Sequence, residues 1–220
     1  CGSGSFLLGA YQKLLEWYRA YYEANDPQQW ASAKHPPIYQ AGPQDWKLTT
    51  AERKRILLDH IYGVDIDPQA VEVTKLSLLL RVLEGEKNLV LFHNERALPD
   101  LADNIKCGNS LIGPDFYEGK QFTMFDDDER LRINAFDWHA EFPHAFKDGG
   151  FDAVIGNPPY ILLQDRFRND GELLYLRKHY YVASFKLDTY HLFLEKGVGL
   201  LRPSGIVSMI TPANFLTNNY

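Results

Sequence analysis

Phe151-Asp152-Ala153-Val154-Ile155-Gly156 runs directly into Asn157-Pro158-Pro159-Tyr160. The first six residues are mostly apolar, which is typical of a buried parallel strand. Proline has no backbone N–H and a fixed φ, so the strand ends where the prolines begin. Ligands of open α/β sheets bind at the carboxyl ends of strands. We therefore expect 157–160 to be a loop that offers oxygen acceptors and an aromatic ring to a planar group carrying an amino group.

A four-residue motif recurs by chance, so 157–160 is also compatible with an ordinary proline turn. Other strand ends favour a ligand site. A short strand over 61–67 ends in acids, and Asp67-Pro68 is typical of a helix N-cap followed by proline in the first turn. With Asp67 capping, Asp65 is left for a ligand, where nucleotide-binding folds place a ribose-binding carboxylate. A third strand, over 105–111, carries Asn109 near its end.

The first residues, Cys1-Gly2-Ser3-Gly4, form a Gly-x-Gly turn before a helix expected over about 3–24. Backbone N–H groups at such a turn can approach a ligand closely. The turn lacks the third glycine of a dinucleotide-binding motif and the lysine of a P-loop, so alone it is a weak signal. The face of the helix that we expect to be buried comprises Phe6, Leu7, Ala10, Leu14 and Trp17 or Tyr18.

Residues 25–60 explain the long spacing between Gly4 and Asp65. We interpret them as an insertion into a βαβ unit: a polar, proline-rich loop, then a helix that Thr50 is expected to cap. Beyond them, helices expected over 68–84 and 187–201 alternate with strands. This alternation predicts an α/β fold with a doubly wound, mostly parallel sheet.

Composition narrows the function classes. The chain of 220 residues has 45% hydrophobic and 14% aromatic residues, which excludes a disordered protein. No apolar run is long enough to span a bilayer. The net charge of −6 argues against a self-sufficient nucleic-acid binder. Two cysteines favour a reducing cytoplasm. We expect no metal site, because His139 and His144 have no nearby cysteine and Asp126–Glu129 is typical of a solvated loop.

Residues 164–186 interleave basic and aromatic side chains. This mixture is typical of a surface that contacts phosphates and stacks on bases, and equally of an amphipathic helix on a core.

The order of these motifs resembles that of the γ-class N6-adenine DNA methyltransferases: Gly2-Ser3-Gly4, Asp65, Asn109 and Asn157-Pro158-Pro159-Tyr160. Further segments are similar to the large methylases of type IIG restriction–modification systems: Pro36–Tyr39, Arg53–Leu58 and Tyr62–Pro68. The resemblance covers nearly all of the chain. It implies a Rossmann-like fold that binds S-adenosylmethionine, and methyl transfer to a flipped adenine in double-stranded DNA. Whether an endonuclease is fused to the protein or associates with it stays open.

The resemblance assigns roles by position. Asp65 would hold the cofactor ribose, Ile66 would pack on its adenine, and Asn109, where many relatives have Asp, would face the adenine amino edge. Asn157 would border the cofactor and, with the Pro158 carbonyl, accept the amino protons of the target base. Tyr160 would stack on that base, and Pro159 completes the catalytic motif. The methionine end of the cofactor would be lined by Cys1, Gly2, Ser3 and Gly4.

The chemistry agrees with such a loop. The lone pair of adenine N6 is conjugated into the ring and is a poor nucleophile. Two acceptors on its protons draw the nitrogen toward tetrahedral geometry and stabilise the charge that develops. The motif therefore needs no strong base, but the adenine must leave the helix stack to reach it.

We expect residues 1–220 to be a fragment of a methyltransferase domain, because this fold class places a central strand before Cys1. The domain that reads the DNA sequence would lie outside the chain, with 164–186 as a candidate second DNA contact. Three alternatives stay open. Protein glutamine N5-methyltransferases share the Asn157–Tyr160 motif, cytosine-N4 enzymes more often have serine at Asn157, and a non-catalytic subunit could keep the fold to bind nucleic acid.

Overall fold

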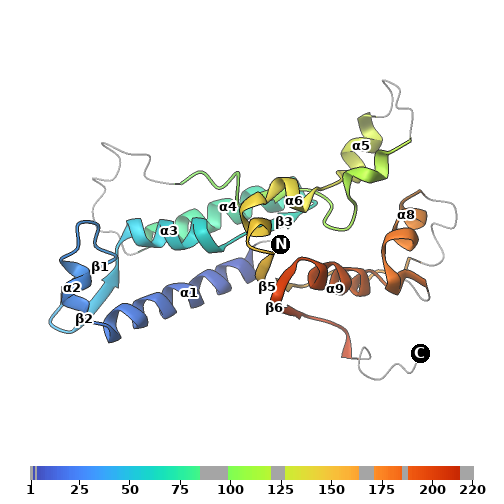
Figure 1. Cartoon of the computed structure of the whole chain (residues 1–220). Helices are drawn as coiled ribbons and strands as arrows, with labels where there is room; N and C mark the ends of the chain where they lie inside the picture. The colour runs from blue at the N-terminus through green and yellow to red at the C-terminus, as the bar shows by residue number, and fades with distance from the viewer. Residues whose placement is uncertain are drawn as a thin grey trace. The chain divides into compact units, whose positions relative to one another are not determined.

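The computed structural model describes residues 2, 4–84, 99–119, 127–163, 171–184 and 188–213. It is a mixed α/β chain with small sheets. Two compact units divide it, residues 1–63 with 67–106, and residues 64–66 with 107–220. The elements, of which η2 and η3 are 3-10 helices, are labelled in Figure 1 where space allows: α1 (Ser5–Ala24), α2 (Pro27–Ala31), β1 (Ile38–Gly42), β2 (Asp45–Leu48), α3 (Thr50–His60), β3 (Gly63–Asp65), α4 (Pro68–Leu83), β4 (Ile105–Cys107), η2 (Pro114–Tyr117), α5 (Asp127–Ile133), α6 (Trp138–Glu141), α7 (Pro143–Lys147), β5 (Phe151–Gly156), α8 (Gly171–His179), η3 (Tyr181–Ser184), α9 (Thr189–Gly199) and β6 (Leu201–Met209).

One apolar stripe of α1 builds the core of the first unit, and α3 and α4 pack against this helix (Figure 1). Tyr11 lies fully buried in the stripe, and its hydroxyl donates to the carbonyl of Arg53 at 2.9 Å. Burial raises the pKa of Tyr11. Leu7 is buried as expected, and Ala10, Leu14 and Tyr18 pack against the core in part, whereas Phe6 and Trp17 are exposed. The buried positions of the helix are Leu7, Tyr11, Leu15 and Tyr22.

Residues 25–60 are more ordered than the loop we expected. They contain α2 and an antiparallel hairpin of β1 and β2, in which Ile38 pairs with Leu48 and both side chains are buried. The residue that caps α3 is Thr49, so the expectation of Thr50 was wrong by one position. The Thr49 hydroxyl accepts the N–H of Glu52 at 3.3 Å and donates to the carbonyl of Pro36 at 3.0 Å.

Short strands flank α4, and the predicted cap of this helix is confirmed. The Asp67 carboxylate accepts the N–H of Gln69 at 2.8 Å, and proline follows in the first turn. In the first unit the N–H of Gly63, in β3, donates to the carbonyl of Asn104, just before β4, at 2.8 Å. Helix α4 contributes four residues to the core: Val71, Thr74, Leu78 and Val82.

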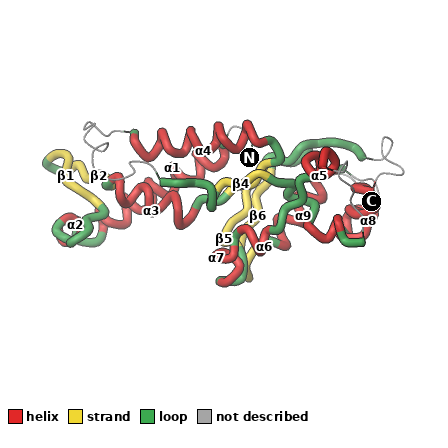
Figure 2. Tube along the Cα trace, turned by 90° about the horizontal axis from the view of Figure 1, so that it is seen from above, coloured by secondary structure: helices red, strands yellow, loops and turns green. Residues whose placement is uncertain are grey.

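In the second unit, β5 pairs with β6 in parallel, in a register that runs from Ala153 opposite Ile206 to Gly156 opposite Met209 (Figure 2). Helix α9 packs on one face, so closely that a Cβ at Gly197 would lie 2.8 Å from the Met209 side chain. On the other face Ile155 and Ile206 are exposed in the described part of the chain. The predicted parallel strand over 151–156 is therefore confirmed, but its burial on both faces was wrong, because α9 covers only one face.

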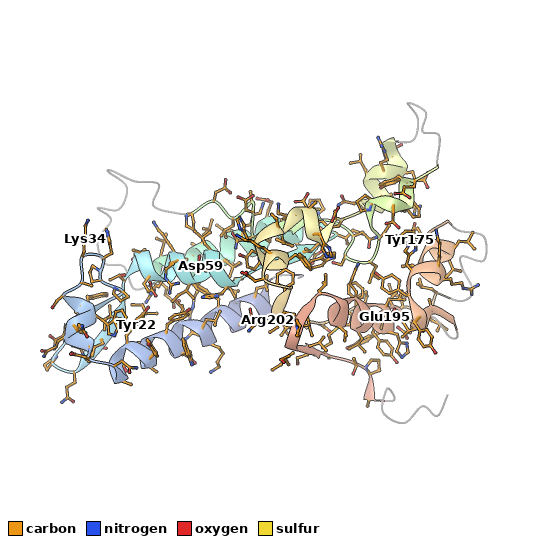
Figure 3. The ribbon with its side chains drawn as sticks, viewed as in Figure 1. Tyr22, Lys34, Asp59, Tyr175, Glu195 and Arg202 are labelled. Atoms are coloured by element: carbon orange, nitrogen blue, oxygen red, sulfur yellow. The ribbon has the colours of Figure 1, made fainter. Side chains whose placement is uncertain are left out.

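The remaining core of the second unit lies between α5, α8, η3 and α9. Tyr175 in α8 donates to Asp115 at 2.7 Å and accepts the Gly113 N–H at 3.1 Å, and burial with this carboxylate raises the pKa of Tyr175 to about 12. Glu195 in α9, labelled with Tyr175 in Figure 3, accepts the N–H groups of Tyr181 and Val182 and so caps η3. Residues 127–129, expected in a solvated loop, instead begin α5. None of the helices in the described ranges is long and apolar enough to cross a membrane.

A buried carboxylate in the first unit, paired with a partly exposed arginine, gives a stability prediction. Glu52, 8% exposed, accepts Arg55 at 2.7 Å and the hydroxyl of Tyr22 (labelled in Figure 3) at 2.7 Å. Burial raises the pKa of Glu52, but these hydrogen bonds outweigh it and place the pKa below its usual 4.5. We expect Glu52→Gln to lower the free energy of unfolding at pH 7 by about 1–3 kcal/mol, the range for hydrogen bonds to charged groups.

Urea unfolding measures this loss, and pH supplies a second check. Because the folded pKa is depressed, the contribution of Glu52 is present above the unfolded pKa and is lost as the pH falls through the folded value. The gap between wild type and Glu52→Gln should therefore close below pH 4.5. The control is Glu16→Gln, which removes an ion pair of the same spacing with Lys13, at 2.8 Å, on the exposed surface. Equal losses in both variants would contradict the prediction.

Candidate active site

The loop 157–160 is fixed to the end of β6. The Gly156 carbonyl, at the end of β5, accepts the N–H of Ile210 at 3.0 Å, which continues the parallel pairing one residue past β6. The Tyr160 hydroxyl then donates to the Ile210 carbonyl at 2.9 Å and lies 3.4 Å from Oδ1 of Asn157. The four residues predicted to be catalytic are thus held together at the carboxyl end of a parallel strand, as the sequence indicated.

The loop presents acceptors to solvent. Pro158 is buried, whereas Asn157 is exposed and Tyr160 is 47% exposed. The Tyr160 ring meets Tyr190 edge to face, with centroids 6.0 Å apart, and this contact fixes the plane of the ring. The two prolines have no N–H to donate, so their backbone offers carbonyl oxygens alone. This arrangement can accept hydrogen bonds from a planar amine beside an aromatic ring.

A second group of polar residues lies at the ends of β3 and β4 in the same unit. The Gly108 N–H donates to the Asp65 carbonyl at 2.8 Å, and the Cys107 sulfur lies 3.6 Å from the Ile66 carbonyl. Asp65 is half-buried and the Ile66 side chain is 52% exposed. Gly108 has no room for a side chain, because a Cβ there would lie 2.4 Å from the Phe136 ring.

Asn109 is held by hydrogen bonds to the backbone of two other residues. Its N–H donates to the Asn134 carbonyl at 2.7 Å, and its Oδ1 accepts the Leu111 N–H at 3.1 Å. The amide oxygen therefore already has one partner and keeps one lone pair for a further donor. The predicted contact of Asn109 with an adenine amino group requires that lone pair.

Two residues near these strand ends were not anticipated. Asn134, with a φ of 46°, places its side-chain nitrogen 3.4 Å from the Cys107 sulfur. The Trp138 indole donates to the Ser110 carbonyl at 3.1 Å and contacts the Phe151 ring edge to face, which links the end of β4 to the start of β5. A lone asparagine and a lone tryptophan give no sequence signal, because their partners come from distant segments.

The glycine turn belongs to the first unit. Gly4 precedes α1 with a φ of 77°, and the helix has no side-chain cap. A Cβ at Gly4 would lie 2.9 Å from the Thr74 side chain, whose hydroxyl donates to the Gly2 carbonyl at 3.2 Å. The expected turn before a helix is therefore present. Cys1 and Ser3, also predicted to bind the cofactor, lie outside the described residues.

Residues 164–186 are described in part, since 164–170 and 185–187 lie outside the described residues. Leu173 and Leu176 of α8 are buried in the core of the second unit, which supports the interpretation as an amphipathic helix. Arg177 and Lys178, at the end of α8, are exposed, and Tyr181 in η3 is 89% exposed. These basic and aromatic side chains are thus accessible.

Two titratable groups of α9 have shifted pKa values. Burial lowers the pKa of His191 in α9, and Asp188 offsets part of this shift. Burial likewise lowers the pKa of Lys196, whose ammonium lies 5.9 Å from the centre of the Tyr180 ring. Among the described residues, no group of three or more His, Cys, Asp or Glu side chains is placed to hold a metal ion.

The chain matches one family model, that of the Eco57I restriction-modification methylase, over residues 59–220. It is 31% identical over 217 residues to the type II restriction enzyme and methyltransferase RM.Eco57I of Escherichia coli. The aligned residues are 98% of this chain and 19% of the relative. It is 35% identical over 194 residues to the putative type II restriction enzyme and methyltransferase RM.MjaORFECS2P of Methanocaldococcus jannaschii. The aligned residues are 88% of this chain and 14% of that relative.

A third relative is the adenine-specific methyltransferase PglX of Streptomyces coelicolor, 28% identical over 173 residues, which covers 77% of this chain and 12% of the relative. The chain thus spans a fifth or less of the length of each of these curated relatives.

The close approach at Gly108 gives a prediction about the second group of polar residues. We expect Gly108→Ala to lower the free energy of unfolding by about 1–3 kcal/mol, because the methyl group overlaps the Phe136 ring. The matched control is Gly9→Ala in α1, where a Cβ meets nothing within 4 Å and alanine should stabilise the helix by up to about 1 kcal/mol. Chemical denaturation compares the two, and a neutral Gly108→Ala would contradict the packing described.

Proposed function

Because this chain belongs to the Eco57I restriction-modification methylase family, we propose that it carries the catalytic residues of a DNA methyltransferase that methylates adenine at N6. The observation that carries the proposal is the loop 157–160, which places accessible acceptors and an aromatic ring at the end of a parallel strand. The name of one relative as an adenine-specific methyltransferase supports adenine as the target.

In the proposed reaction the loop binds the amino group of a flipped adenine. Asn157 Oδ1 and the Pro158 carbonyl accept hydrogen bonds from its two N–H groups, which localises the lone pair on N6 and stabilises the positive charge that develops there. Tyr160, held by Ile210 and Tyr190, stacks on the base. Positioning and electrostatics supply the rate enhancement, and the amino proton leaves after methyl transfer without a strong base at the loop.

The family requires a methyl donor, and we propose S-adenosylmethionine, which when bound supplies an electrophilic methyl group. The residues present fit its adenosine end. Asp65 offers a carboxylate to the ribose, the exposed Ile66 offers an apolar surface to the adenine, and Asn109 offers an acceptor to the adenine amino group. The assignment of Cys1, Gly2, Ser3 and Gly4 to the methionine end, and of Asn157 as a neighbour of the cofactor, rests on the sequence motif and stays a prediction.

We propose a doubly wound, Rossmann-like arrangement for the complete fold. Two features support it. Strands β3 and β4 share a sheet and are joined through α4, and β5 and β6 pair in parallel and are joined through α8 and α9. Each is a strand, helix and strand connection of the kind that builds such sheets. On this proposal residues 25–60 are an insertion within the methyltransferase domain.

The relatives are much longer than this chain, and two of them are named as restriction enzymes as well as methyltransferases. We propose that parts of the protein outside residues 1–220 read the DNA sequence, and that an endonuclease is fused to them or associates with them in the cytoplasm. Within the chain, the exposed Arg177, Lys178 and Tyr181 are a candidate second contact with double-stranded DNA.

The decisive experiment substitutes Asn157 in the full-length protein. We expect Asn157→Ala to slow single-turnover methyl transfer to duplex DNA about a hundred- to a thousandfold, as for loss of one preorganised hydrogen bond to developing charge. Asn157→Asp keeps an oxygen acceptor and should retain part of the adenine methylation. Cofactor affinity should change little in either. Wild-type rates in Asn157→Ala would refute the catalytic role, and methylation of protein glutamine in place of DNA would refute the proposed substrate.

A pair of aspartates separates cofactor binding from helix capping. We expect Asp65→Ala to weaken S-adenosylmethionine binding by about 1–3 kcal/mol in titration calorimetry, the range for hydrogen bonds to a charged group. Asp67→Ala removes the cap of α4 and should lower stability by about 1 kcal/mol with little change in affinity. The reverse pattern would show that the ribose site is assigned to the wrong aspartate.

A further inference from the structure

We propose that Thr189, the first residue of α9, is a positioning residue for methyl transfer, because its hydroxyl holds the loop 157–160 in the shape that lets Asn157 and Pro158 accept the target amine. The proposal rests on the proposed function and adds to it a residue outside the sequence motif. Thr189 touches the loop without taking part in the reaction.

Three hydrogen bonds join Thr189 to Pro159 in the loop and to Ile161 directly after it. Its hydroxyl donates to the Pro159 carbonyl and accepts the Ile161 N–H at 3.1 Å. Its backbone N–H donates to the Ile161 carbonyl, also at 3.1 Å. The bonded groups belong to Pro159 and Ile161, the residues on either side of Tyr160. Thr189 itself is buried, with 8% of its surface exposed.

The loop needs a hydrogen-bond donor from outside, because its two prolines cannot donate a backbone hydrogen bond. Backbone turns are commonly closed by N–H groups within the turn, and Pro158 and Pro159 have none. A donor for the Pro159 carbonyl must then come from elsewhere in the fold, and the Thr189 hydroxyl is such a donor. The same oxygen accepts the N–H that resumes the chain after the motif, so one side chain fixes the exit of the loop.

The entry of the loop is held by a different element. Gly156 and Tyr160 both bond to Ile210 after β6. Asn157 and Pro158 therefore lie between two anchors, one at β6 and one at the start of α9. A displacement of about 1 Å in a catalytic group can cost a hundredfold in rate, so the anchor at Thr189 bears on the reaction although it is remote from the reacting atoms.

The start of α9 is itself well fixed. Asp188 caps the helix through the Tyr190 N–H, so the Thr189 hydroxyl is not required for capping. Asp188 also pairs with Leu162 in an antiparallel bridge. Further along, Gly197 lets α9 pack tightly on Val207 and Met209 of β6. Thr189 thus connects the loop to a helix whose position is set by the same sheet.

Thr189→Val and Thr189→Ser test the proposal in the full-length protein. Valine has the shape of threonine without the hydroxyl, and serine keeps the hydroxyl. We expect Thr189→Val to lower the single-turnover rate of adenine methylation about ten- to a hundredfold, with less than about a twofold change in cofactor affinity and in KM for DNA. Thr189→Ser should stay within about threefold of wild type, because the hydrogen bonds to Pro159 and Ile161 are kept.

The matched control is Thr49→Val in the first unit. Thr49 also starts a helix, and its hydroxyl also joins a proline carbonyl to a backbone N–H, at Pro36 and Glu52. We expect this variant to lose melting temperature and to keep the wild-type rate, so a general loss of stability is separated from misplacement of the loop. If Thr189→Val fails to fold, Thr189→Ala removes the same hydroxyl with less bulk and is judged by the same rates.

Two results would overturn the role of Thr189 while the proposed function stands. One is a wild-type rate in folded Thr189→Val, and the other is an equal loss in Thr189→Ser, which would implicate packing and not the hydroxyl. A wild-type protein that methylates no adenine in duplex DNA would overturn the proposed function itself, and the role of Thr189 with it.

Discussion

The parallel pairing of β5 with β6 is the constraint on which the candidate site depends. It brings the carboxyl end of β5 beside that of β6 and continues into the bond from the Ile210 N–H to the Gly156 carbonyl. Everything that follows on the chain, from Asn157 to Ile161, is positioned from that point. The prolines lack the N–H groups that commonly close a turn. The loop is instead held by the Tyr160 hydroxyl, which donates to the Ile210 backbone carbonyl, and by the Thr189 hydroxyl of α9, which donates to the Pro159 carbonyl.

The two groups of polar residues in the second unit suit two different ligands. The ends of β3 and β4 offer a carboxylate, an exposed isoleucine and an amide, which suit an adenosine. The end of β5 offers oxygen acceptors and a ring, which suit a base with an amino group. Trp138 lies between them in the fold, because its indole bonds to Ser110 and its rings contact Phe151. On the proposed function, the two groups would bind the two substrates of one methyl transfer, which agrees with the restriction-modification methylase family.

Structural features that depend on neighbouring residues in the sequence were predictable. Features that depend on contacts between distant residues were not. The strand over 151–156 and the Asp67 cap follow from apolar patterning and from Asp-Pro, and the structure confirms both. The hairpin of residues 38–48 was missed because Pro43 and the polar residues around it favour a loop, whereas the burial of Ile38 with Leu48 is a contact between separate positions. The contact of Thr189 with Pro159 joins residues 30 positions apart, and no local pattern announces it. Exposure of one face of β5 likewise depends on which helices cover it.

The missing N–H groups of Pro158 and Pro159 have one more consequence, for the choice among bases. A pocket edge made of lone pairs attracts an exocyclic amine and repels an exocyclic oxygen. Adenine and cytosine carry an amine at that position, whereas guanine and thymine carry a carbonyl. A guanine or thymine that swings out of the duplex would meet oxygen with oxygen at this loop. If the loop binds its target as proposed, the two prolines would therefore favour adenine and cytosine over guanine and thymine at this position.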